Sequence, residues 1–145
     1  MDSEETFLIR ILQPGRTRFK DKRILVVDRD FVWENDFYPL LSEGGNSDPF
    51  IETESFKTGR IIQGKEEWFS ICWSETAMVN GTMSNMAALL FMRDLLQSKA
   101  FSKATAFYGT LFIFRCLLNT KDDTVQYVDI DICMRQFVDL YHSIH

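Results

Sequence analysis

Hydrophobic residues near the N-terminus of this chain lie two apart, which is the spacing of a β-strand. Phe7 and Ile9 fall on one side of residues 5–12, and the apolar run 24–27 follows after a short polar connection. A period of two is typical of strands, and two strands joined by a short connection form an antiparallel hairpin. The sequence therefore predicts a hairpin from residues 5–12 and 23–28.

The middle of the chain continues this strand pattern after a loop at 42–49. Residues 31–40 predict a short helix that Pro39 disturbs or ends. Glycine-containing turns at 57–59 and 64–65 separate three further segments that predict strands, namely 50–56, 60–63 and 67–79. In the last of these, large apolar residues alternate with Ser and Cys, which is typical of a strand with one buried face.

The most apolar part of the chain, residues 84–118, predicts the core. Its first part, 84–99, has apolar residues at helical spacing around a polar stripe of Arg93, Asp94, Gln97 and Ser98, and Thr82 or Ser84 can serve as its N-cap. Residues 102–118 also fit a helical face, although Phe112-Ile113-Phe114 has strand propensity and Gly109 weakens a helix. For this segment we predict a helix.

The C-terminal residues predict a short strand at 124–128 and an amphipathic helix at 129–144. Taken together, these elements predict an α+β fold in which N-terminal antiparallel β-hairpins pack on two or three C-terminal helices. A chain of 145 residues is the size of one domain, so we expect a single globular domain over residues 1–145.

The composition shows an excess of aromatic residues and indicates the cellular compartment of the protein. Aromatic residues make up 14% of the chain, including 13 Phe, and aromatic side chains are enriched in the cores of protein interfaces. Cys72, Cys116 and Cys133 are an odd number at long spacings and read as reduced thiols. The sequence lacks a signal-peptide pattern and an apolar run long enough to span a bilayer. We therefore predict a cytoplasmic or nuclear protein.

Charge is strongly segregated along the chain. Residues 10–23 contain six basic residues against Asp21, a local charge of +5, so the remainder carries −10 to give the net charge of −5. Such a segment can bind phosphate oxygens or an acidic partner, or it can pair with acids of its own protein. In the first case Phe19 is free to stack on a base. The candidate anion-binding residues are Arg16, Arg18, Phe19, Lys20, Lys22 and Arg23.

The motifs for catalysis or metal binding in this sequence are incomplete. Residues 59–65 match G-x-x-x-x-G-K, but Glu66 stands where a phosphate-binding loop needs a Ser or Thr hydroxyl, and the intervening residues suit a strand. His142 and His145 lie at a metal-ligand spacing without a third ligand nearby. A pairing of Cys72 with a histidine has no sequence feature that would activate the thiol. We predict no catalytic residue, no metal and no cofactor.

These observations favour a binding role over an enzyme. We expect a non-enzymatic protein-interaction module, an adaptor or accessory subunit, that docks a protein partner or a second copy of itself through exposed aromatic side chains. The candidate partner-binding residues are Trp33, Phe37, Trp68 and Trp73. The alternative is binding of nucleic acid or another anionic surface through the basic loop 16–23. A deep pocket holding two or more titratable groups would instead favour an enzyme.

Overall fold

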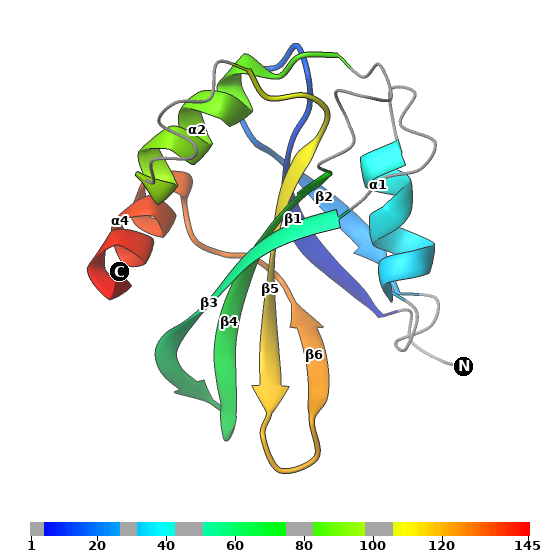
Figure 1. Ribbon diagram of the computed structural model, residues 1–145. Helices are drawn as coiled ribbons and strands as arrows, with labels where there is room; N and C mark the ends of the chain where they lie inside the picture. The colour runs from blue at the N-terminus through cyan, green and yellow to red at the C-terminus, as the bar shows by residue number, and fades with distance from the viewer. Residues whose placement is uncertain (1–4, 27–31, 43–50, 75–82, 98–105) are drawn as a thin grey trace.

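The computed structural model describes residues 5–26, 32–42, 51–74, 83–97 and 106–145 of the chain. Six strands in these ranges form one antiparallel sheet in the order β2-β1-β5-β4-β3, and β6 pairs with β5 beside this path (Figure 1). The strands are β1 (Thr6–Leu12), β2 (Lys20–Leu25), β3 (Ile51–Ile62), β4 (Lys65–Ser74), β5 (Leu111–Asn119) and β6 (Thr124–Val128).

Strand β5 is the centre of the sheet. One side of β5 pairs with β4 along most of its length, from Cys72 opposite Phe112 to Glu66 opposite Leu118. The other side is shared, because β1 pairs with its first three residues and β6 pairs with residues 115–119. The strongly apolar strand β5 thus has a strand on both sides along most of its length.

Helices cover both faces of this sheet. A π-helical turn, η2 (Trp33–Phe37), continues into α1 (Tyr38–Ser42) on one face, here called the η2/α1 face. The other face, here called the α2/α4 face, carries α2 (Met86–Leu96) and α4 (Met134–Ile144) (Figure 1). None of the helices within the described residues has the length and apolar character required to cross a membrane.

The alternation of side chains along β5 divides the core in two. Leu111 and Ile113 pack in the cluster beneath α2 and α4, whereas Phe112 and Phe114 pack in the cluster beneath η2 and α1. A strand that is covered on both faces needs apolar residues at every position rather than at every second one. This requirement explains the continuous run Leu111–Phe114.

The predicted fold class is wrong in its balance of strands and helices. The described residues form mainly a six-stranded antiparallel sheet with three short α-helices, and one of these helices lies in the N-terminal half. The predicted helix over 102–118 is the cause of the error, because 111–118 belongs to β5. A strand buried on both faces and a buried helix both appear in a sequence as an uninterrupted apolar run, so periodicity could not separate them.

Other elements agree more closely with the sequence. The predicted strands 5–12 and 124–128 are confirmed as β1 and β6. Strand β3 continues through the predicted turn at 57–59, whereas the turn at 64–65 does connect β3 to β4. The predicted loop at 42–49 lies outside the described residues except for Ser42, which ends α1.

Candidate functional site

Helix α2 is fixed to the sheet by Asn85, which is fully buried. Its Oδ1 accepts a hydrogen bond from the Ala88 N–H at 3.1 Å, so Asn85 is the N-cap of α2 in place of the predicted Thr82 or Ser84. Its Nδ2 donates to the carbonyls of Leu12 at 3.0 Å and Gly109 at 2.9 Å. One side chain therefore ties the start of α2 to the end of β1 and to the approach to β5.

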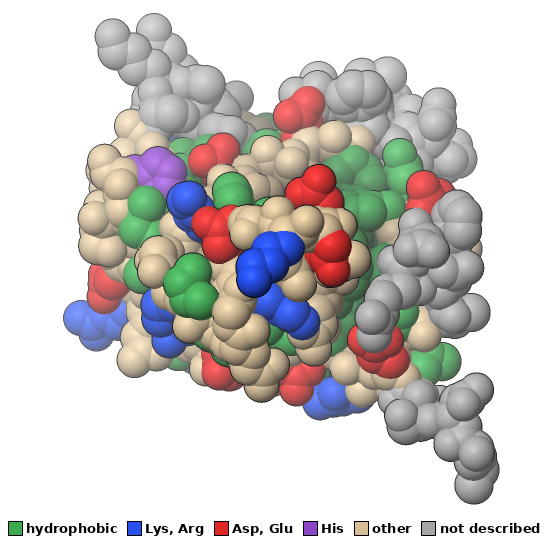
Figure 2. All heavy atoms as spheres, turned by 90° about the horizontal axis from the view of Figure 1, so that it is seen from below, with side chains coloured by type: hydrophobic (Ala, Val, Ile, Leu, Met, Phe, Trp, Pro, Cys, Tyr) green, Lys and Arg blue, Asp and Glu red, His purple; other side chains and the backbone are tan. Residues whose placement is uncertain are grey.

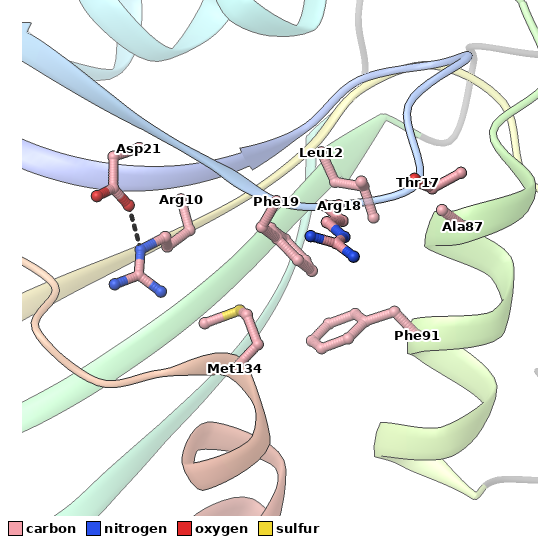
Figure 3. A pocket seen from close by; sticks show the side chains of 9 residues that line it. All are labelled: Arg10, Leu12, Thr17, Arg18, Phe19, Asp21, Ala87, Phe91 and Met134. Carbon is pink, nitrogen blue, oxygen red and sulfur yellow. Dashed lines mark ion pairs between the residues drawn. The ribbon is translucent and has the colours of Figure 1, made fainter.

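The connection between β1 and β2 lies beside the first turns of α2, and two cavities open between them. One cavity, of about 540 Å³, is lined by Arg10, Leu12, Thr17, Arg18, Phe19, Asp21, Ala87, Phe91 and Met134 (Figure 3). The other, of about 530 Å³, is lined by Gly15, Arg16, Thr17, Ser84, Met86, Ala87 and Leu90. Because Thr17 and Ala87 line both, the cavities are adjoining halves of one surface groove, here called the α2 groove.

Aromatic packing forms the floor of the first cavity. The rings of Phe19 and Phe91 meet edge to face with centroids 5.0 Å apart, and Figure 3 shows them turned toward one another with Met134 close by. Both rings are partly buried and pack against the core beneath α2 and α4. Phe19 is therefore packed into the groove floor rather than held out as a free ring.

Exposed apolar side chains lie at the second cavity. Met86 and Leu90 line it and are 60% and 56% exposed, and Met83, just before the N-cap of α2, is 65% exposed; such exposure is unusual for side chains of this size. The spacing of four residues places Met86 and Leu90 in one line along α2. Contiguous exposed apolar side chains next to polar ones are typical of a surface that another molecule covers.

Only part of the basic segment pairs with acids of the protein itself. Arg10 forms an ion pair with Asp21 (Figure 3), and Arg10 Nη1 also donates to the carbonyl of Ile132 at 3.0 Å. Arg23 lies 3.8 Å from Asp129. The remaining four basic residues form no ion pair with any residue in the described ranges, and they are Arg16, Arg18, Lys20 and Lys22.

Strand alternation divides these four cations between two faces of the sheet. On β2 the side chains of Lys20 and Lys22 point the same way as Ile24, which packs in the core of the η2/α1 face. Arg16 and Arg18 instead line the α2 groove. The structure thus brings Arg16, Arg18 and Phe19 together and places Lys20 and Lys22 elsewhere, so the predicted anion-binding residues do not form one surface.

The predicted aromatic partner surface is dispersed as well. Phe37 is 0% exposed and packs against Phe112 and Phe114, so it cannot contact a partner. The three tryptophans are half-buried, and they lie on different faces. Trp33 packs in the core of the η2/α1 face, and Trp68 points to that face from β4. Trp73 packs against the core of the α2/α4 face.

The sequence contained a signal for the exposed residues that its interpretation missed. The polar stripe recognised on α2 includes Asp94 and Gln97. Extended toward the N-terminus at steps of four residues, the same stripe falls on Leu90 and Met86. A solvent-facing stripe that changes from polar to apolar along one helix predicts a covered surface at its apolar end.

A second charged cluster lies on the same face, where β3 bulges opposite β4. Residues 58–60 all lie opposite Glu67, whose side chain is 0% exposed. Gly59 has φ +87°, a conformation that glycine adopts without strain, and it allows the bulge. The carboxylate accepts hydrogen bonds from Thr58 Oγ1 at 2.6 Å, Arg60 Nη2 at 2.6 Å and Arg115 Nε at 2.7 Å.

In this Glu67 cluster (Thr58, Arg60, Glu67 and Arg115), the three donor side chains all bind the one carboxylate. Burial alone would raise the pKa of Glu67, but the hydrogen bonds from Arg60, Thr58 and Arg115 outweigh it and lower the pKa to about 2. An ionised carboxylate with all its partners in place is a structural anchor rather than a proton acceptor. Figure 2 looks onto the end of the molecule with the β3–β4 and β5–β6 turns, where acidic and basic side chains lie close together.

The cysteines and histidines do not form a catalytic or metal-binding set. Burial raises the pKa of Cys72 far above its usual value, and burial also raises the pKa of Cys116 to about 11, so both are protonated thiols at neutral pH. His142 Nε2 lies 2.9 Å and 3.0 Å from the carbonyl oxygens of Asp94 and Leu95 at the end of α2. In the part of the chain that the structure describes, no three His, Cys, Asp or Glu residues are grouped as metal ligands.

The α2 groove holds titratable groups, which is the feature expected of an enzyme. Its charged groups are Arg10, Arg18 and Asp21 in one half and Arg16 in the other. Asp21 is paired with Arg10. The residues that line the groove thus offer mainly positive charge and apolar surface.

Comparison of the chain with models of protein families, with curated proteins and with solved structures finds no match. Interpretation of the groove therefore depends on its geometry and charge.

Proposed function

We propose that this protein is a non-enzymatic interaction module, an adaptor or accessory subunit, that docks a protein partner on the α2 groove. The observation that carries the proposal is the exposed line of Met86 and Leu90 on α2, which borders the groove together with Arg16 and Arg18. Covering apolar surface releases about 25 cal/mol for each Å² removed from water. A partner that also brings carboxylates would supply the ion-pair partners that Arg16 and Arg18 lack among the described residues.

The same observation favours a protein over a nucleic acid. A nucleic acid is bound through a continuous run of cations that tracks its phosphates. Here the cations without an internal partner lie on two faces of the sheet, and the two in the groove adjoin apolar side chains that phosphates would not cover. The net charge of −5 also opposes general attraction to a polyanion.

Photo-crosslinking tests this docking surface. A benzoylphenylalanine at position 90 should give a discrete protein adduct in an extract of the native source. The matched control is position 61, because Ile61 is 64% exposed but lies at the far end of the hairpin β3–β4. Adduct formation should fall when Met86→Gln is added. An adduct of the same size and yield at position 61, or adducts with nucleic acid alone, would refute the proposed function.

A further inference from the structure

The charge and apolar surface of the α2 groove indicate which kind of partner segment binds there. We infer that the α2 groove binds an acidic amphipathic α-helix of the partner protein, an inference that rests on the proposed function. Three features carry the inference: the backbone of the groove walls, the spacing of the exposed apolar side chains and the placement of the two arginines.

Strand β1 presents no free edge to the groove. At the groove, Arg10 and Ile11 of β1 pair with β2 on one side and with β5 on the other. The rest of the lining comes from the β1–β2 connection, from Asp21 of the end strand β2, and from side chains of α2 and α4. An extended peptide lying along β1 would find no strand edge there and would leave its backbone N–H and C=O groups without partners against apolar surface. A helix satisfies its own backbone hydrogen bonds and avoids this cost.

The apolar line on α2 has the spacing that a second helix matches. Met86 and Leu90 are four residues apart, which is about 6 Å along α2 and about one turn of a partner helix. A partner helix with apolar residues at i, i+3 or i+4, and i+7 would cover Met86 and Leu90 together. One large side chain from it can enter the adjoining cavity of about 540 Å³, above Phe19, Phe91 and Met134.

The two arginines determine the charge of the occupant. Arg16 lines one cavity and Arg18 lines the other, so the cations lie along the groove rather than at a single point. A guanidinium binds a carboxylate through two parallel N–H···O bonds, which favours Glu or Asp side chains on the helix that lies between them. Asp21, the acid that lines the groove, is already paired with Arg10. Carboxylates of the partner would therefore supply the ion pairs that Arg16 and Arg18 lack among the described residues.

Fluorescence anisotropy with defined peptides tests the inference. The probe is a labelled, Ala-rich 18-residue helix with Leu at i, i+3 and i+7 and Glu on the flanks. It should bind the whole protein at about 10–100 μM, and the same helix with Gln in place of Glu should bind about tenfold more weakly. The same sequence with Pro at its centre, which breaks the helix, should lose binding altogether.

Matched protein variants distinguish the effect of charge in the groove on binding from the effect of the overall charge of the protein. Arg16→Gln with Arg18→Gln should weaken binding of the Glu helix about tenfold and leave binding of the Gln helix within about twofold. Lys20→Gln with Lys22→Gln removes the same charge from the opposite face and should leave both affinities within about twofold. Leu90→Gln should weaken binding of both helices.

The outcomes distinguish the inference from the proposed function. No binding of the Glu helix at about 1 mM, equal binding of the Glu and Gln helices, or retained binding of the Pro peptide would overturn the acidic helix. The proposed function would survive these results if position 90 still gave the discrete protein adduct and Met86→Gln still reduced its yield. A twelve-residue oligothymidine that displaces the Glu helix with steep salt dependence would overturn the inference and assign the groove to nucleic acid.

Discussion

Two pairs of arginines lie on the α2/α4 face of this sheet, and they are in opposite electrostatic situations. Arg60 and Arg115 both donate to the buried carboxylate of Glu67. Arg16 and Arg18 line a groove and have no acid partner among the described residues. The first pair lies where Glu67 pairs with Leu117 of β5, and the second lies near the opposite end of the same strand.

The difference shows that the role of a charged side chain depends on its surroundings and not on its residue type alone. Glu67 is 7 residues from Arg60 and 48 residues from Arg115, and a bulge brings Thr58 and Arg60 onto it. Those charges are used within the fold. The groove arginines make no ion pair with the described residues. Changes in the Glu67 cluster should therefore affect stability, and changes in the groove arginines should affect binding.

The largest expected effect is that of Glu67→Gln. The change leaves two guanidiniums facing a neutral amide in a buried place, and removal of one member of a buried ion pair typically costs several kcal/mol. We expect the free energy of unfolding to fall by about 3 kcal/mol, measured by urea denaturation at pH 7. The matched control is Glu66→Gln, since Glu66 pairs with the exposed Lys57 and should contribute less than about 1 kcal/mol. Equal losses for the two variants would contradict the structural role of the Glu67 cluster.

A smaller effect is expected at Asn85, which holds the groove wall in place. Asn85→Ala removes the N-cap of α2 and leaves the buried carbonyls of Leu12 and Gly109 without these donors. We expect a loss of about 2.5 kcal/mol in the free energy of unfolding, which thermal or urea denaturation measures. Ser84→Ala, one residue away and exposed, should change it by less than about 0.5 kcal/mol. A loss of less than about 1 kcal/mol for Asn85→Ala would mean that α2 is held by its apolar contacts alone.

Acid should weaken the Glu67 cluster in a defined window of pH. The pKa of Glu67 is about 2 in the folded protein against an ordinary 4.5, so between these values the unfolded chain binds a proton that the folded chain does not. Its contribution is complete above pH 4.5 and is lost as the pH falls toward 2. Because Arg60 is largely exposed and partly screened, we expect a loss of about 2 kcal/mol over this window.

The Glu67→Gln variant isolates this contribution. Its stability is measured by urea denaturation at several pH values and compared with that of the parent protein. The difference between the two should shrink as the pH falls from 5 to 2, since the variant has no carboxyl group at this position. A difference that stays constant with pH would show that Glu67 does not titrate in the window stated.

The sequence predicted those parts of the fold in which local pattern and environment agree. The strands β1 and β6 were found from short runs of strand-forming residues. The error at 102–118 arose because β5 is covered on both faces, so that Leu111 and Phe112 are buried in different cores. Which of two elements an apolar run forms depends here on contacts with distant segments, and a local pattern does not contain them.

The candidate site was predicted only in part. The basic segment drew attention to Arg16 and Arg18, but alternation on β2 placed Lys20 and Lys22 on the other face. The aromatic surplus suggested a surface, yet large rings such as Phe37 mainly fill the two cores. The exposed line on α2 could have been read from its helical spacing. Its proximity to the basic loop could not, because that depends on how Asn85 ties α2 to β1.

The smallest expected effect on stability is that of Arg16→Gln with Arg18→Gln, and it tests the comparison directly. These side chains make no ion pair within the described residues, so their loss should change the free energy of unfolding by less than about 0.5 kcal/mol. Arg115→Gln, measured by the same urea denaturation, should cost about 2 kcal/mol because Glu67 loses a buried donor. A loss above about 1 kcal/mol for the groove variant would show that Arg16 and Arg18 stabilise the fold. The proposed distinction between the arginines of the Glu67 cluster and those of the α2 groove would then be wrong.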